Sequence, residues 1–115
     1  MPDGAPVDIK TSRHGDAAVL RAVGDVDMSG SPLLRESLRQ MLQAKPSRLI
    51  VDLGGVEYMD SSGVATLVEA MKNARAGGTK LALCAMKPRV RGIFEIARLD
   101  KYFAIFDTAD QALAG

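Results

Sequence analysis

The sequence has few of the residues from which metal centres and base-stacking surfaces are built. It contains one cysteine, one histidine and no tryptophan, and only 4% of its residues are aromatic. The lone Cys84 excludes an internal disulfide and a multi-cysteine zinc site. The lone His14 excludes a histidine-rich metal centre, and few rings are available to stack on nucleic-acid bases. We therefore expect no metal site and no cofactor.

An excess of one charge sign and a long apolar run are also absent. Fifteen basic and fourteen acidic residues give a formal net charge of +1, far from the basic excess that nucleic acids select. The longest apolar run, Leu81 to Met86, is far shorter than the roughly 20 residues of a membrane span. The polar residues 1–10 do not resemble a secretory signal. The sequence predicts no nucleic-acid partner, no membrane span and a cytoplasmic location.

What the chain does contain is enough apolar sequence for one core. Hydrophobic residues make up 47% of the 115 residues and charged residues 25%, which is typical of a folded globular protein. This length suits one domain. We expect a single domain over residues 1–115, with a flexible N-terminus at residues 1–6.

The first half of the chain predicts a hairpin followed by a helix. Alternating side chains from Val7 to Thr11, turn residues around Gly15 and an apolar segment at 17–23 favour an opening β-hairpin. Ser31 followed by Pro32 is typical of a capping residue and the first helical position. This pattern predicts a helix that is capped by Ser31 and stops before Lys45-Pro46.

The second half alternates short apolar segments with helical patterns. Branched, nearly continuous apolar segments predict strands covered on both faces, and apolar side chains spaced three or four residues apart predict helices. The expected strands are 49–53, 81–85 and 104–106, and the expected helices start after Asp60, at Pro88 and at Thr108. Strands joined through helices run parallel. We predict an α/β fold with a mixed, mostly parallel sheet of about five strands, about four helices and an opening β-hairpin.

One polar segment lies where parallel sheets usually carry function. Asp60-Ser61-Ser62-Gly63 follows a predicted strand and opens a helix. The N–H groups of a first helical turn stabilise an anion, so a phosphate on a serine would be accommodated. Gly63 lacks a Cβ atom, and we expect this to let another protein approach the hydroxyls. A simpler interpretation is that Asp60 or Ser61 only caps the helix.

Several segments along the chain resemble the STAS domain of bacterial anti-sigma factor antagonists. The resemblance extends over nearly the whole chain and implies the STAS fold. It rests on 49–53 with 56–63, on Gly24-Asp25-Val26-Asp27 before the first helix, and on Gly77-Gly78, 80–84, Pro88-Arg89-Val90 and Phe94.

This resemblance implies a regulatory role without enzymatic activity. In the family, the second serine of the motif is phosphorylated by an anti-sigma factor that is itself a serine kinase, which points to Ser62. The unmodified protein binds that anti-sigma factor and frees the sigma factor, and a serine phosphatase of the metal-dependent class resets the switch. The residues implied to bind the partner are Asp25, Asp27, Asp60, Ser61, Ser62 and Gly63.

The sequence also bears on other functions. Asp52 ends a predicted strand, as in a phosphorylated receiver domain, but the required acidic pair after the first strand is missing. A hydrolase is disfavoured because no Gly-x-Ser-x-Gly turn is present and His14 is the only imidazole. Two roles stay open, an accessory subunit of a lipid-transport ABC complex and a non-switching scaffold of a stress-signalling complex. The basic cluster Lys87, Arg89 and Arg91 favours a solvated helix face, with a partner or anion contact as the alternative.

Overall fold

The computed structural model describes residues 7–115, which form a five-stranded sheet and four helices. The predicted flexible N-terminus at residues 1–6 lies outside the described residues. The elements follow in the order β1 (Asp8–His14), β2 (Ala17–Val23), α1 (Ser31–Gln43), β3 (Arg48–Gly55), α2 (Ser61–Gly77), β4 (Lys80–Cys84), α3 (Pro88–Ile96), β5 (Ala104–Phe106) and α4 (Ala109–Ala114).

The strands lie in the sheet in chain order. The β1 and β2 strands form an antiparallel hairpin with Gly15 at a positive φ of 67° in its turn, and each later neighbour pair is parallel. The α/β fold with a mixed, mostly parallel sheet and an opening hairpin is confirmed. Because β2, β3, β4 and β5 point the same way, the loops that follow them meet at one end of the sheet.

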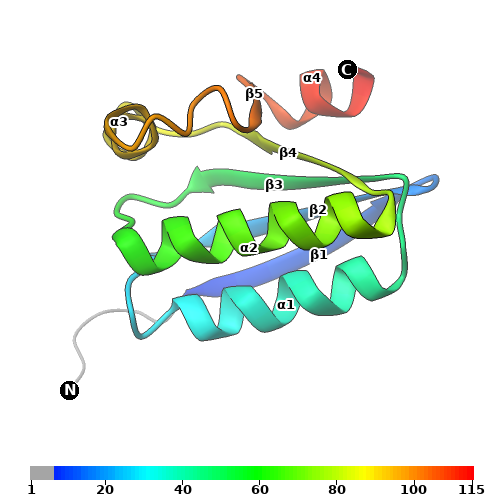
Figure 1. The fold of residues 1–115 in the computed structure, drawn as a ribbon, viewed down its shortest axis with the longest axis horizontal. Coiled ribbons are helices and arrows are strands. Elements are labelled where there is room, and N and C mark those ends of the chain that lie inside the picture. Colours follow the sequence, from blue (N-terminus) through cyan, green and yellow to red (C-terminus); the bar gives the residue numbers. More distant parts are fainter. Residues whose placement is uncertain (1–6) are drawn as a thin grey trace.

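Helices cover the two faces of the sheet unequally. In Figure 1, α1 and α2 lie side by side across one face, and α4 lies on the other. Successive side chains of a strand point to opposite faces, so Leu49 and Val51 join the larger core under α1 and α2 while Ile50 packs with Ala112 of α4. The larger core also receives Phe94 from α3. The sheet is thus the fixed layer from which the loops extend.

The start of α1 differs from the prediction. Gly30 occupies the N-cap position, and Ser31 is already the first helical residue. The carboxylate of Asp27 accepts hydrogen bonds from the backbone N–H groups of Ser29 and Gly30, at 3.0 and 3.1 Å. The prediction that Ser31 caps the helix is therefore wrong, since the turn before it is closed by Asp27.

Arg48 ties α4 to the sheet. Its Nη1 atom donates to the carbonyl oxygens of Ala112 and Leu113, at 3.1 and 2.6 Å. We expect Arg48→Met to lower the free energy of unfolding by about 1–2 kcal/mol, because two carbonyls lose a charged donor. Urea unfolding measures this. Arg39→Met is the control, since the Arg39 side chain forms only an exposed ion pair with Glu36. Equal losses of unfolding free energy in both variants would show that the bonds from Arg48 to α4 do not stabilise the fold.

Cys84 is a buried thiol in the smaller of the two cores, which also contains Ile50 and Ala112. Burial raises its pKa from 9.0 to about 11, with a smaller contribution from the Asp52 carboxylate. We expect native Cys84 to react with iodoacetamide far more slowly at pH 8 than in the urea-unfolded chain. The thiol ionises first in the unfolded chain, so its contribution to stability is full below pH 9 and is lost as the pH rises to about 11. Equal alkylation rates in both states would contradict this.

Candidate functional site

Two loops at the carboxyl ends of β2 and β3 are bonded to each other. Gly24 N donates to Gly55 O at 2.9 Å, Val26 N to Tyr58 O at 3.0 Å, and Asp60 N to Val26 O at 3.2 Å. An isolated parallel bridge joins Val26 to Met59. Residues more than thirty positions apart in the chain therefore form one surface, which contains both acidic segments predicted from the sequence.

Asp60 caps α2 and also holds a serine hydroxyl. Its Oδ1 atom accepts from Ser62 N at 2.9 Å, from Gly63 N at 3.4 Å and from Ser62 Oγ at 2.6 Å. The predicted cap at Asp60 is confirmed. Ser62 is half-buried, whereas Ser61 is exposed. The two candidate serines thus differ in surroundings although they are adjacent.

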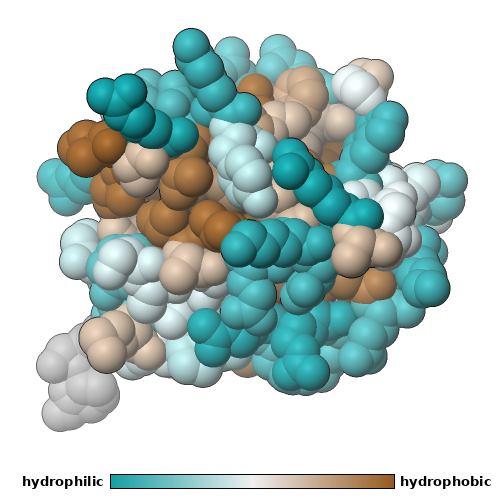
Figure 2. Space-filling view, viewed as in Figure 1, coloured by the Kyte–Doolittle hydropathy of each residue, from teal (hydrophilic) through white to brown (hydrophobic). Residues whose placement is uncertain are grey.

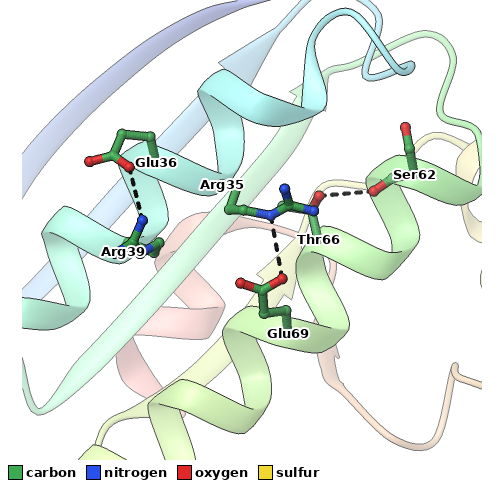
Figure 3. Close-up of polar contacts among 6 residues, drawn as sticks. All are labelled: Arg35, Glu36, Arg39, Ser62, Thr66 and Glu69. Atoms are coloured by element: carbon green, nitrogen blue, oxygen red, sulfur yellow. Dashed lines mark hydrogen bonds and ion pairs between the residues drawn. The ribbon is translucent and has the colours of Figure 1, made fainter.

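A second contact fixes the first turn of α2. The hydroxyl of Thr66 donates to the carbonyl oxygen of Ser62 at 2.9 Å, as Figure 3 shows. Further along, Arg35 of α1 pairs with Glu69 of α2 at 3.3 Å. The first contact lies within α2 and the second joins α2 to α1.

Gly63 has a different role from the one that the sequence suggested. The residue is buried, and a Cβ atom there would lie 2.7 Å from Met59 Cγ, 2.8 Å from Val26 Cγ1 and 2.9 Å from Val26 O. The missing side chain therefore lets α2 approach the chain's own β2 loop. The interpretation that it opens space for another protein is wrong.

Asp27 adds a second carboxylate to this surface, and Asp25 beside it is exposed. The hydroxyl of Ser29 donates to Asp27 Oδ1 at 2.6 Å and is the main reason that the pKa of Asp27 lies below its usual 3.8. The turn repeats the contacts of the Asp60 turn, with Ser29 in the place of Ser62. Sequence reasoning missed this repeat, although the Asp-x-Ser-Gly spacing occurs twice.

Apolar side chains flank the loops and were also missed. Met28 is 78% exposed in the first loop and Tyr58 is 45% exposed in the second. Figure 2 shows apolar residues gathered over the region where Figure 1 places α3 and the first half of α2. Ile96 of α3 is 87% exposed. In the sequence, these residues could have been found as large apolar side chains that fall outside the predicted strands and outside the apolar faces of the predicted helices.

Two of the three basic residues at the start of α3 have partners within the chain. Lys87 pairs with Glu57, and Arg91 with Glu95, each at 3.5 Å. The positive charge at the start of α3 is thus partly balanced by the protein's own carboxylates. Within residues 7–115, no group of three or more acidic, cysteine or histidine side chains is arranged to hold a metal ion, and no helix has the length and hydropathy needed to cross a bilayer.

Comparison with known proteins identifies the family. The STAS-domain family model matches residues 8–112. The chain belongs to the STAS-domain family. The resemblance predicted from the sequence is thereby confirmed, and the five-stranded sheet with its opening hairpin is the STAS fold.

Several relatives of this STAS domain are named as anti-sigma factor antagonists. The anti-sigma-F factor antagonist RsfB of Mycobacterium tuberculosis is 29% identical over 114 residues, which cover 99% of this chain and 91% of that protein. The anti-sigma-B factor antagonist of Listeria monocytogenes is 31% identical over 100 residues, 86% of each chain. A crystal structure of an anti-sigma factor antagonist from Mycobacterium paratuberculosis superposes with a TM-score of 0.87 at 25% identity, over 94% of this chain and 92% of that one.

Proposed function

We propose that this STAS domain is an anti-sigma factor antagonist controlled by phosphorylation of Ser62. The unphosphorylated form binds an anti-sigma factor serine kinase and releases the sigma factor. The observation that carries the proposal is the Ser62 hydroxyl, half-buried at the start of α2 and bordered by exposed Ser61. The functions named for the two relatives support the same class.

The docking surface comprises the two joined loops. Asp25, Asp27 and Asp60 supply negative charge, and Ser61 and Ser62 supply hydroxyls, while buried Gly63 sets the approach of the helix. A partner that fits this surface presents positive charge and N–H donors, with apolar groups to cover Met28 and Tyr58. All these features lie at one end of the sheet.

A phosphate on Ser62 would disrupt this match without unfolding the domain. It adds about −1.5 to −2 charges at pH 7. The carboxylate of Asp60 already lies 2.6 Å from Ser62 Oγ, and Asp27 is ionised in the neighbouring turn. The N-terminus of α2 stabilises the added charge within the protein. A partner surface that packs against the neutral Ser62 hydroxyl has no room for a bulky dianion at this point, so docking would be lost.

In this proposal, the partner enzymes catalyse both the addition and the removal of the phosphate. The chain supplies the acceptor hydroxyl, the kinase supplies the phosphoryl group, and a serine phosphatase of the metal-dependent class removes it in the cytoplasm. The only imidazole, His14, pairs with Ala17 at the start of β2, so it lies at the opposite end of the sheet from Ser62. No histidine is therefore placed to activate this serine for hydrolysis.

The test uses every anti-sigma factor serine kinase encoded in the same genome, each purified and mixed with the full chain. With at least one kinase we expect a complex that is stable before ATP is added. After MgATP is added, mass spectrometry should locate one phosphate on Ser62 and the complex should dissociate. Phosphate on Thr66 or nowhere, or a complex that survives phosphorylation, would refute the proposal.

A further inference from the structure

The β1 strand forms one edge of the sheet and has no strand on its outer side within residues 7–115. It pairs with β2 along all seven of its residues without a bulge, it contains no proline, and every side chain except Ile9 is exposed. The opposite edge is β5, which has only three residues. Natural edge strands are usually short, bulged, interrupted by proline, covered or defended by charges. Strand β1 has only the last of these devices, so the placement of its charges decides what it can pair with.

The free main-chain groups of β1 belong to every second residue. Only two residues separate His14 from Ala17, so this pair closes the hairpin with hydrogen bonds. The even-numbered residues of β1 therefore bond to β2, and the odd-numbered residues direct their N–H and C=O groups outward. The alternation along the neighbouring strand agrees, because Gly24 N, at an even position, donates to Gly55 O of β3. The outward residues are Ile9, Thr11 and Arg13.

We propose that β1 pairs antiparallel with β1 of a second copy of this chain, about a two-fold axis at Thr11. Thr11 is the midpoint of Asp8–His14, so this register pairs the two strands over their full length. Ile9 of one copy then lies opposite Arg13 of the other, and both use outward main-chain groups. About six main-chain hydrogen bonds would join the copies. The inference concerns a different surface from the one around Ser62 and does not depend on the proposed function.

The charges along β1 favour this register over its neighbours. With Thr11 on the axis, Asp8 lies opposite His14, and Lys10 lies opposite Ser12. Moving the axis one residue toward the N-terminus places Lys10 opposite Lys10 of the second copy. Moving it one residue the other way places Lys10 opposite His14. Like charges directly opposite each other destabilise a strand pair, so of these three registers the full-length one is favoured.

A groove beside β1 offers apolar surface to the second copy. It runs between β1 and α1, which lie next to each other in Figure 1, and consists of two hollows that share Thr11 and Met41. One hollow also contains Ile9 and Leu33, and Leu33 is 47% exposed. Because Arg13 of the second copy lies opposite Ile9, its aliphatic stem would cover that side chain. The pairing thus adds apolar contacts on the α1 side of the sheet to the main-chain bonds.

Two sets of variants test the pairing and its register. Thr11→Pro removes the outward N–H group at the axis while β1 keeps its bonds to β2, and Thr11→Val is the matched control that keeps this group. His14→Asp places carboxylates opposite each other at both ends of the paired strands, and adding Asp8→Lys restores opposite charges there. Urea unfolding verifies that each variant is folded. Sedimentation equilibrium of the full chain, from micromolar to near-millimolar concentrations, gives the dimer dissociation constants.

We expect the wild type to dimerise, with Thr11→Val and the double variant within about threefold of its dissociation constant. Thr11→Pro and His14→Asp should each dimerise at least about tenfold more weakly. A wild type that stays monomeric at every concentration would overturn the inference. A dimer that Thr11→Pro leaves unchanged, or a charge swap that fails to rescue His14→Asp, would overturn it as well. None of these results bears on the phosphorylation of Ser62, so the proposed function is tested separately.

Discussion

Ser62→Asp is expected to weaken binding to the anti-sigma factor kinase about a hundredfold or more. The new carboxylate would stand beside Asp60, whose Oδ1 lies 2.6 Å from the present hydroxyl, and in a surface that already contains ionised Asp27. Placing an unpaired charge in a docking surface shaped for a neutral group costs about 2–5 kcal/mol. Titration calorimetry with the purified kinase measures the loss.

The control for this variant places the same charge elsewhere. Ser12 lies exposed on β1, and its hydroxyl bonds to His14 Nε2, 3.1 Å away. Ser12→Asp should bind the kinase within about threefold of the wild type, because exposed charges beyond a Debye length are screened. Ser62→Asp should not unfold the domain, since an acidic residue in the first turn of α2 is favourable. Equal affinities for both variants would contradict the switch.

Gly63→Ala is expected to lower the free energy of unfolding by about 1–3 kcal/mol and to weaken kinase binding at the same time. A methyl group at this position would lie within 3.0 Å of Met59 and of both the side chain and the carbonyl of Val26. Two of the nearest atoms belong to a neighbouring loop, so relief of the clash moves the helix start away from that loop. Urea unfolding and calorimetry give the two quantities.

Two other glycines in helices provide matched controls. Gly77 near the end of α2 and Gly92 within α3 have open space where a Cβ atom would be placed. Alanine favours a helix over glycine by roughly 0.5–1 kcal/mol, so Gly92→Ala should be neutral or stabilising. Gly77→Ala should likewise leave kinase affinity unchanged. A loss of stability in these variants equal to that of Gly63→Ala would show that packing against Val26 is not the cause.

The fold followed from sequence because its signals are local and mutually consistent. The apolar period of α2 and the glycines at its end predict the helix, and Gly78 indeed takes the left-handed conformation as its C-cap. The continuous apolar segment around Ile50 predicts a strand covered on both faces, and the structure shows helices on both. Asp60 as a cap follows from residue type and position alone.

What the sequence could not predict depends on contacts between distant segments. Ser31 was expected to cap α1 from its place before Pro32, but Asp27 closes the preceding turn and shifts the cap to Gly30. The packing of Gly63 on Val26 arises only when the loops after β2 and β3 are brought together. Neither spacing nor propensity carries that information.

The grouping of the site residues could not be predicted from sequence either, because it also depends on contacts between distant segments. Asp25, Asp27 and Asp60 could be named as candidates, but their grouping at one end of the sheet requires the parallel register of β2 and β3. The exposure of Met28 and Tyr58 likewise depends on where the helices lie. A resemblance supplied Ser62 as acceptor, whereas the contact that distinguishes it from Ser61 is visible only in three dimensions.

The central claim is tested most directly with a chain that carries phosphoserine at position 62, installed during synthesis, beside the unmodified chain. Both are titrated into the anti-sigma factor kinase by calorimetry, and both are melted to compare their stability. We expect the phosphorylated chain to lose at least about a hundredfold in affinity while its melting temperature stays within a few degrees. Equal affinity of the two chains, or unfolding of the phosphorylated one, would contradict the account.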